Sequence, residues 1–228
     1  VYKIFGPGNQ FVTAAKQLAS LEGVAIDMPA GPSEVLVYGD ETGNADFIAS
    51  DLLSQAEHGA DSQVIFVTCV KSLITDVEKA VVKQLADLPR KEIAAKALEN
   101  STLILMKNES SALELINEYG PEHLIIGAKN EDLFINEVSN AGSVFLGNYT
   151  PESAGDYASG TNHTLPTNGY AKSYSGVSLD SFTKKITYQK ITKEGLKDLG
   201  PIIETMAEAE ELYAHKNAVT LRLNEMNN

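Results

Sequence analysis

The four histidines of this 228-residue chain each lie in a polar segment flanked by turn-forming residues. His58 and His123 directly follow a glutamate, His163 lies in the same small-residue loop as Asp156, and His215 lies near the C-terminus. Histidine is the commonest metal ligand, and its unperturbed pKa lies close to neutral pH. Histidines placed beside acids and amides at segment ends therefore favour a metal site or a proton-transfer site over four unrelated surface side chains.

A first candidate pair is Gln55 and His58, near the C-terminal end of a predicted helix over residues 45–58. Apolar side chains at helical spacing give this segment one buried face. Residues three apart share a face, so the pair could bind one metal ion. Glutamine is an unusual zinc ligand, and a histidine is also favoured at a helix C-terminus by the helix dipole. From these residues alone, both interpretations stay open.

Glu122 and His123 form a second candidate pair. They follow Gly120 and Pro121, which end a predicted helix, so the pair is expected in a helix-to-strand turn from which both side chains could reach a cleft. A carboxylate and an imidazole side by side can divide two proton transfers between them. We therefore favour a functional pair over an ordinary solvated turn.

The segment from residue 148 to residue 178 shows no clear helix or strand pattern and is rich in Gly, Ser, Thr, Asn and Tyr. It offers Glu152, Asp156 and His163 among small residues, which let a ligand approach the backbone closely. Asp156 could supply a third metal ligand. Ordered loops of this length are usually functional, and the alternative is a Ser/Gly-rich linker.

Two further motifs are weaker. The GPGN turn at residues 6–9 precedes a predicted helix and could present backbone amides to a phosphate, but a short glycine turn alone is a weak signal. Gly200-Pro201 is predicted to begin a tail helix that carries Glu210 and His215. Five residues apart, these two side chains would lie on different faces of a helix unless one lies near a bend.

The elements that must position these residues alternate along the chain. Short apolar strands are expected at residues 35–38, 64–70, 103–106, 124–126 and 144–146, and helices at 45–58, 73–88, 92–98, 111–118 and 131–138. This alternation predicts an α/β fold with a mostly parallel sheet covered on both faces. We expect incomplete Rossmann-like domains: the end of one at residues 1–30, which form a βαβ unit, and a main domain at 31–178. A helical C-terminal arm at 179–228 is expected to begin with a short strand at 185–188.

Composition limits the partners. A net charge of −13 argues against nucleic-acid binding and against docking on an anionic membrane, and no apolar stretch approaches the roughly 20 residues of a membrane helix. The single cysteine, Cys69, lies in an apolar run, so we expect inert packing and a cytoplasmic protein. The chain starts without Met, and residues 1–5 run as a predicted strand straight into the turn at residues 6–9, as in the middle of a domain, so we expect a fragment or a cleaved chain.

A series of motifs, in order along the chain, closely resembles the histidinol dehydrogenase family, and the resemblance covers essentially all 228 residues. The motifs are FGPGN (5–9), DMPAGPSE (27–34), LSQAEHG (53–59), YGPEHL (119–124), GSVFLG (142–147), SAGDYASGTNH (153–163) and AHKNAV (214–219). The family's chain is nearly twice as long, so an N-terminal half with other NAD contacts is expected to be missing here.

The resemblance implies a zinc- and NAD-dependent enzyme of histidine biosynthesis that oxidises L-histidinol, through L-histidinaldehyde, to L-histidine. It implies zinc ligands at Gln55, His58 and Asp156, with His215 supplied by a partner subunit. By the same resemblance, His123 removes the alcohol proton and Glu122 activates the water that attacks the aldehyde.

The resemblance also implies the remaining contacts. Ser33, His163 and Glu210 match substrate contacts, in addition to the metal ligands and His123, and Asn9 matches an NAD contact. His163 and Glu210 are expected from the second subunit of a homodimer with shared active sites. Cys69 matches no functional position. Two rivals remain: a zinc hydrolase that uses Glu122 as general base, and a truncated chain that retains metal and dimer contacts without turnover.

Overall fold

The computed structural model describes residues 1–227, which fall into two compact units. The first unit spans Val1–Phe182, and the second begins at Thr183. The predicted boundaries at 30/31 and 178/179 therefore differ from the observed division, since residues 1–30 belong to the same compact unit as the main sheet.

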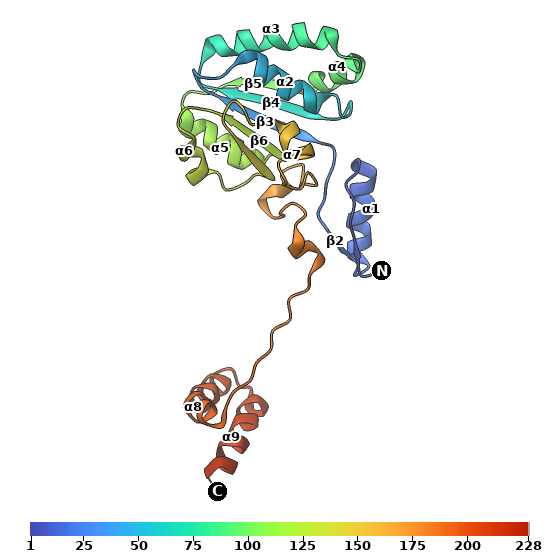
Figure 1. The fold of residues 1–228 in the computed structure, drawn as a ribbon. Helices are drawn as coiled ribbons and strands as arrows, with labels where there is room; N and C mark the ends of the chain where they lie inside the picture. Colours follow the sequence, from blue (N-terminus) through green and yellow to red (C-terminus); the bar gives the residue numbers. More distant parts are fainter. Residues whose placement is uncertain (228) are drawn as a thin grey trace. The chain divides into compact units, whose positions relative to one another are not determined.

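The first unit is built on a five-stranded sheet in which all neighbouring strands are parallel. The strands are β3 (Glu34–Gly39), β4 (Gln63–Thr68), β5 (Thr102–Leu105), β6 (His123–Gly127) and β7 (Ser143–Leu146), in the order β5-β4-β3-β6-β7 (Figure 1). Within this sheet, the chain first forms the central strand β3, continues through β4 to the edge strand β5, and then forms β6 and β7 on the other side of β3. This is the doubly wound arrangement. The predicted parallel α/β fold is confirmed.

Helices cover both faces of this sheet. One face packs against α2 (Ala45–Ala56), α3 (Lys71–Asp87) and α4 (Lys91–Glu99), and the other against α5 (Glu109–Tyr119) and α6 (Glu131–Glu137). Because both faces are covered, the central strand β3 is buried at every position, which explains its continuous apolar run. Each fully buried Val, Leu or Phe side chain stabilises the fold by about 1.5–3 kcal/mol.

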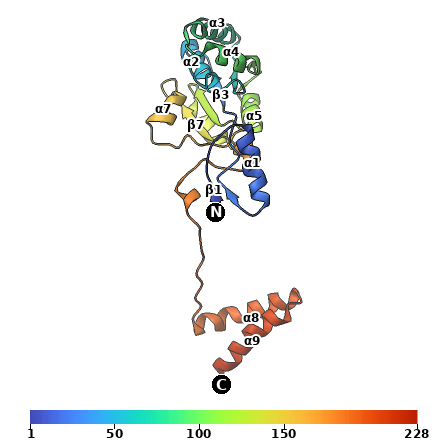
Figure 2. The same cartoon turned by 90° about the vertical axis from the view of Figure 1, so that its right-hand side faces the viewer.

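The N-terminal segment forms the expected βαβ unit, in which β1 (Lys3–Ile4) pairs with β2 (Ala25–Ile26) and α1 (Gln10–Leu21) connects them (Figure 2). The Thr13 hydroxyl donates to the Ala30 carbonyl at 2.6 Å, and the Gln17 amide donates to the Tyr170 hydroxyl at 2.7 Å. The first bond lies within the segment, whereas the second links it to a later part of the first unit, in keeping with the compact unit that extends from Val1 to Phe182.

The stretch predicted to be irregular, residues 148–178, contains a helix, α7 (Glu152–Tyr157), and a short 3-10 turn at Tyr170–Lys172, and a second such turn follows at Leu179–Phe182. Pro151 precedes α7 in an extended conformation, and Glu152 lies in the first turn of the helix, where an acidic residue is favoured. The helix is only six residues long and contains Ser, Ala and Gly, so it has no visible apolar period. Asp156 therefore lies on a helix and not in an irregular loop.

The second unit is a helical hairpin of α8 (Lys193–Ala209) and α9 (Tyr213–Asn227). The predicted strand at 185–188 is wrong, because these residues form no regular element. Pro201 lies inside α8, which begins instead after Thr192, whose hydroxyl accepts from the Gly195 amide at 3.1 Å. No helix in the described part of the chain is long and apolar enough to cross a membrane.

Candidate functional site

A cavity of about 400 Å³ lies at the amino ends of the central strands β3 and β6 of the first unit. The candidate residues that line it are Asn9, Ser33, His58, Glu122, His123, Asp156 and His163. The chain thus brings seven of the predicted site residues, from segments more than 100 residues apart, to one place.

Two glycines shape the approach to this cavity. Gly120 ends α5 in the left-handed conformation (φ 63°) and turns the chain into the Glu122-His123 pair. Gly31 has a φ of 102°, and a Cβ there would lie 1.5 Å from the Gly8 carbonyl oxygen. A side chain at residue 31 would therefore push the N-terminal turn away from the cavity.

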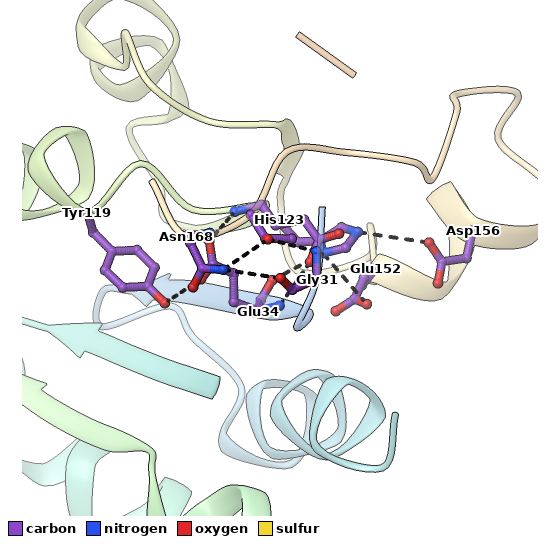
Figure 3. A network of polar contacts seen from close by, with 9 residues as sticks. Gly31, Glu34, Tyr119, His123, Glu152, Asp156 and Asn168 are labelled. Atoms are coloured by element: carbon purple, nitrogen blue, oxygen red, sulfur yellow. Dashed lines mark hydrogen bonds and ion pairs between the residues drawn. The ribbon is translucent and has the colours of Figure 1, made fainter. Parts of the chain in front are cut away.

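Glu122 and His123 are both buried and contact Glu34, the first residue of the neighbouring strand β3. Figure 3 shows His123 next to Glu34. The Glu34 amide donates to the Glu122 carboxylate at 2.9 Å, and the Glu122 amide donates to the Glu34 carboxylate at 3.3 Å. The predicted helix-to-strand turn is therefore a buried and hydrogen-bonded pair, not a solvated turn.

The two ring nitrogens of His123 differ in their surroundings. Nδ1 lies 3.2 Å from the Glu34 carbonyl oxygen, an acceptor, so the network assigns the proton to Nδ1. Nε2 is buried without a hydrogen-bond partner among residues 1–227, and the closest carboxylate oxygen on its side, from Asp156, is 4.0 Å away. Burial lowers the pKa of His123. The ring therefore presents a free lone pair on Nε2.

Two buried carboxyl groups in this region, those of Glu122 and Glu152, have raised pKa values. Burial, together with the nearby Glu34, Glu152 and Asp156, raises the pKa of Glu122 well above its usual range. Burial raises the pKa of Glu152 to about 9, with Asp156 and Asp51 adding to the effect. Acids crowded together next to the C-terminal end of α2 disfavour further negative charge and favour a cation.

One cluster in this region has the donor set of a metal site. The ligand atoms of His58, Glu152 and Asp156 lie within 4.8 Å of one another. Gln55 is fully buried against Glu152, and its side-chain amide, with nitrogen toward the carboxylate, donates to Glu152 at 3.0 Å. Imidazole and carboxylate donors at this spacing fit zinc.

The structure therefore brings together the predicted ligands Gln55, His58 and Asp156, and adds Glu152, to which no role was assigned. α2 ends at Ala56, so His58 lies in the turn after the helix and not on it. Glu152 and Asp156 lie four residues apart on α7 and share a face. That spacing is visible in the sequence only if residues 152–157 are recognised as a helix.

Two other predicted residues, Asn9 and His163, line the cavity. The Asn9 side-chain oxygen caps α1 by accepting from the Phe11 and Val12 amides at 3.0 and 3.2 Å, and the predicted NAD contact stays a prediction. His163 lies in the cavity wall of its own chain, whereas its predicted place was a partner's site.

Glu210 and His215 belong to the second unit. Glu210 follows the last residue of α8, Glu211 adopts a left-handed φ of 60°, and His215 lies in α9. The prediction of a single helix through both is thus wrong, because the chain turns at residues 210–212. Their roles in a partner's site stay predictions.

Known proteins of one family match this chain along nearly its whole length. The histidinol dehydrogenase family model matches residues 1–223. Histidinol dehydrogenases of Bacteroides thetaiotaomicron and Bacteroides fragilis (strain YCH46) are 66% and 64% identical over 224 and 226 residues. These alignments cover 98% and 99% of this chain but 52% and 53% of the relatives.

A crystal structure of histidinol dehydrogenase from Elizabethkingia anophelis matches with a TM-score of 0.96 and 60% identity, over 100% of this chain and 53% of that one. The chain spans about half the length of the relatives that it matches. With a family model over nearly every residue and a cavity that gathers the motif residues, the chain belongs to the histidinol dehydrogenase family.

Proposed function

We propose that the protein containing this chain is a histidinol dehydrogenase that oxidises L-histidinol to L-histidinaldehyde and then to L-histidine. His123 supports this proposal most directly: its buried Nε2 is unpartnered among the described residues and faces Asp156, while Nδ1 is held by the Glu34 carbonyl. A neutral imidazole in this state accepts a proton from a substrate hydroxyl.

The first oxidation removes a hydride and a proton from the alcohol carbon and its oxygen. NAD⁺, when bound, supplies the hydride acceptor. His123 takes the hydroxyl proton on Nε2, and its lowered pKa keeps the ring neutral and ready at neutral pH. The Nδ1–H bond to the Glu34 carbonyl fixes the ring orientation and stabilises the imidazolium that forms.

The second oxidation needs a water molecule as nucleophile and a second proton acceptor. Glu122 is the carboxylate beside His123, and its Oε2 accepts a hydrogen bond from the Glu34 amide. Its raised pKa makes it a stronger proton acceptor than an exposed carboxylate. We assign to Glu122 the proton of the water that attacks the aldehyde.

We further propose that zinc is held by Gln55, His58 and Asp156, with His215 from a partner subunit. Zinc, when bound, supplies a fixed positive charge that orients the imidazole and amino nitrogens of the substrate. A neutral Gln55 ligand leaves the ion more exchangeable toward the substrate than a second anionic ligand beside Asp156 would. A Gln55→Glu variant that turns over normally would count against this role.

The other predicted residues contact the substrate and NAD. Ser33 and His163 line the cavity and contact the substrate, with His163 toward the product carboxylate, and Glu210 contacts the substrate from the partner in a homodimer with shared sites. Asn9 contacts NAD. We also propose a cytoplasmic location, since the reaction needs the cell's NAD⁺ pool.

The test compares two reactions of the protein expressed from its complete coding sequence. We expect NADH formation, followed at 340 nm, with L-histidinol and NAD⁺, loss of this activity with a chelator, and its return with Zn²⁺. The rival zinc hydrolase would release product from an ester or amide of histidine without NAD⁺. No NADH from L-histidinol, or full activity without metal, would overturn the proposal.

A further inference from the structure

The Glu34 side chain has no assigned part in the proposed reaction, yet Glu34 contacts both of the residues that transfer protons. It is 4% exposed and lies next to His123 (Figure 3). Its backbone amide donates to the Glu122 carboxylate at 2.9 Å, and its carbonyl accepts from His123 Nδ1 at 3.2 Å. Since Val35 pairs with His123 across β3 and β6, Glu34 is held opposite Glu122 by the strand register.

The Glu34 side chain binds the same neighbours from the other side. Its Oε1 accepts from the Glu122 amide at 3.3 Å and from the Asn168 amide at 3.0 Å. Asn168 has a left-handed φ of 53°, and its side-chain amide donates to the Gly31 carbonyl at 3.2 Å. One carboxyl group therefore connects the Glu122 turn to the segment around Asn168 and, through it, to Gly31 in the cavity wall.

The number of hydrogens available at the Tyr119 hydroxyl indicates the protonation state of the Glu34 carboxyl group. The Tyr119 hydroxyl has one hydrogen but lies 2.7 Å from Gln63 Oε1 and 3.1 Å from Glu34 Oε2. If the hydrogen goes to the closer acceptor, Glu34 must itself donate to the Tyr119 oxygen. A protonated Glu34 donates to Tyr119 through Oε2 and accepts twice at Oε1, and this arrangement satisfies every group. Burial, which raises the pKa of Glu34 to about 7, agrees with this count.

We propose that Glu34 is a positioning residue for the reaction, and that its neutral carboxyl group sets the placement of Glu122 and His123 by hydrogen bonds and not by charge. This inference rests on the proposed function, since it concerns how that site is held in place. A buried network in which every member is satisfied fixes one geometry, and small displacements of reacting groups reduce rates strongly.

The test uses Glu34→Gln and Glu34→Leu in the protein expressed from its complete coding sequence. Glutamine keeps the oxygen for the two backbone amides and places an NH₂ group toward the Tyr119 oxygen, so it copies the neutral acid. We expect Glu34→Gln to keep kcat within about threefold of the wild type. We expect Glu34→Leu to lower kcat with L-histidinol by about 30-fold or more, while KM stays within about twofold.

Asp40→Asn is the matched control, because Asp40 is a buried acid at the opposite end of the same strand. It should change kcat by less than about threefold, and thermal melts should show that all variants fold. A Glu34→Leu variant with wild-type kcat would overturn the inference, and so would a Glu34→Gln variant as slow as Glu34→Leu. A wild-type protein that forms no NADH would instead overturn the proposed function.

Discussion

The amino ends of the strands in the five-stranded sheet form one of its two ends, here called the amino edge. There, burial raises the pKa of Glu34 to about 7, and His123 has a buried nitrogen without a hydrogen-bond partner among the described residues. At the carboxyl edge of the same strands, Asp40 accepts from the Thr42 amide and hydroxyl at 2.8 and 2.6 Å and from the Lys129 amide at 2.6 Å. Burial acts to raise the pKa of Asp40, but these hydrogen bonds outweigh it and lower the pKa.

This difference separates a structural acid from a functional site. Ligands in doubly wound sheets usually bind at the carboxyl ends of the strands, but here the crowded acids and the cavity lie at the amino ends, beside the C-terminus of α2. Helix N-termini favour anions, whereas helix C-termini favour cations. The amino edge therefore suits a metal ion or a cationic substrate, while the carboxyl edge is satisfied by its own loops.

The largest expected effect is at His123. If the amino edge is the reaction centre, His123→Ala removes the proton acceptor and should lower kcat with L-histidinol by about 10²–10⁴-fold. Asp40→Asn, at the other edge, should change kcat by less than about threefold. Initial rates of NADH formation measure both effects. Equal losses of kcat in the two variants would contradict the assignment of the reaction to the amino edge.

The second prediction concerns stability and pH at Glu34. Its folded pKa of about 7 exceeds the ordinary 4.5, so the folded state binds more protons and its stability falls as pH rises from about 4.5 to about 7. The side chain in the Glu34→Gln variant does not titrate in this pH range. The variant's free energy of unfolding should therefore rise relative to wild type, by on the order of 3 kcal/mol at most, between pH 4.5 and pH 8.

Urea denaturation of both proteins at these two pH values measures the difference. A constant difference between wild type and Glu34→Gln would show that Glu34 titrates in the folded protein as an ordinary acid.

The third prediction concerns Glu152, which contacts Gln55 and lies in the metal-donor cluster. Glu152→Gln should weaken zinc binding by about 10–100-fold, measured by competition with a chromogenic chelator. Glu131→Gln is the control, because Glu131 also begins a short helix but lies outside the donor cluster. Equal zinc affinity in the two variants would remove Glu152 from the metal site.

The smallest effect is expected at Asp40. Its folded pKa is lowered, so the stability that it contributes is present above its unfolded pKa and is lost as pH falls through the folded pKa. Asp40→Asn should cost roughly 1 kcal/mol near pH 7 and less in acid. Denaturation across this range checks the sign, and a cost that grows in acid would contradict it.

The residues that the sequence predicted well are those with local signals. The strands are short buried apolar runs, and Gly120-Pro121 marks the turn that holds Glu122 and His123. Glu34 had no such signal, because its partners Tyr119, Glu122 and Asn168 lie 85 to 134 residues away and meet it only through the strand register.

Elsewhere local signals misled or were too weak. Glu152 was not assigned because α7 is too short and too rich in small residues to show a period. In the tail, Gly200-Pro201 suggested a helix start, although the Thr192 cap begins α8 earlier and Pro201 lies within it. The turn between α8 and α9 depends on the left-handed backbone of Glu211, a conformation that a glutamate in the sequence does not predict.

The most direct test of the central claim, that the amino edge performs two successive oxidations with separate proton acceptors, is the amount of NADH formed per L-histidinol consumed. Wild type should form two NADH, since alcohol to acid is a four-electron oxidation. Glu122→Gln should form one and stop at the aldehyde, which can be trapped with a hydrazine. Two NADH from Glu122→Gln, or none from wild type, would contradict the account.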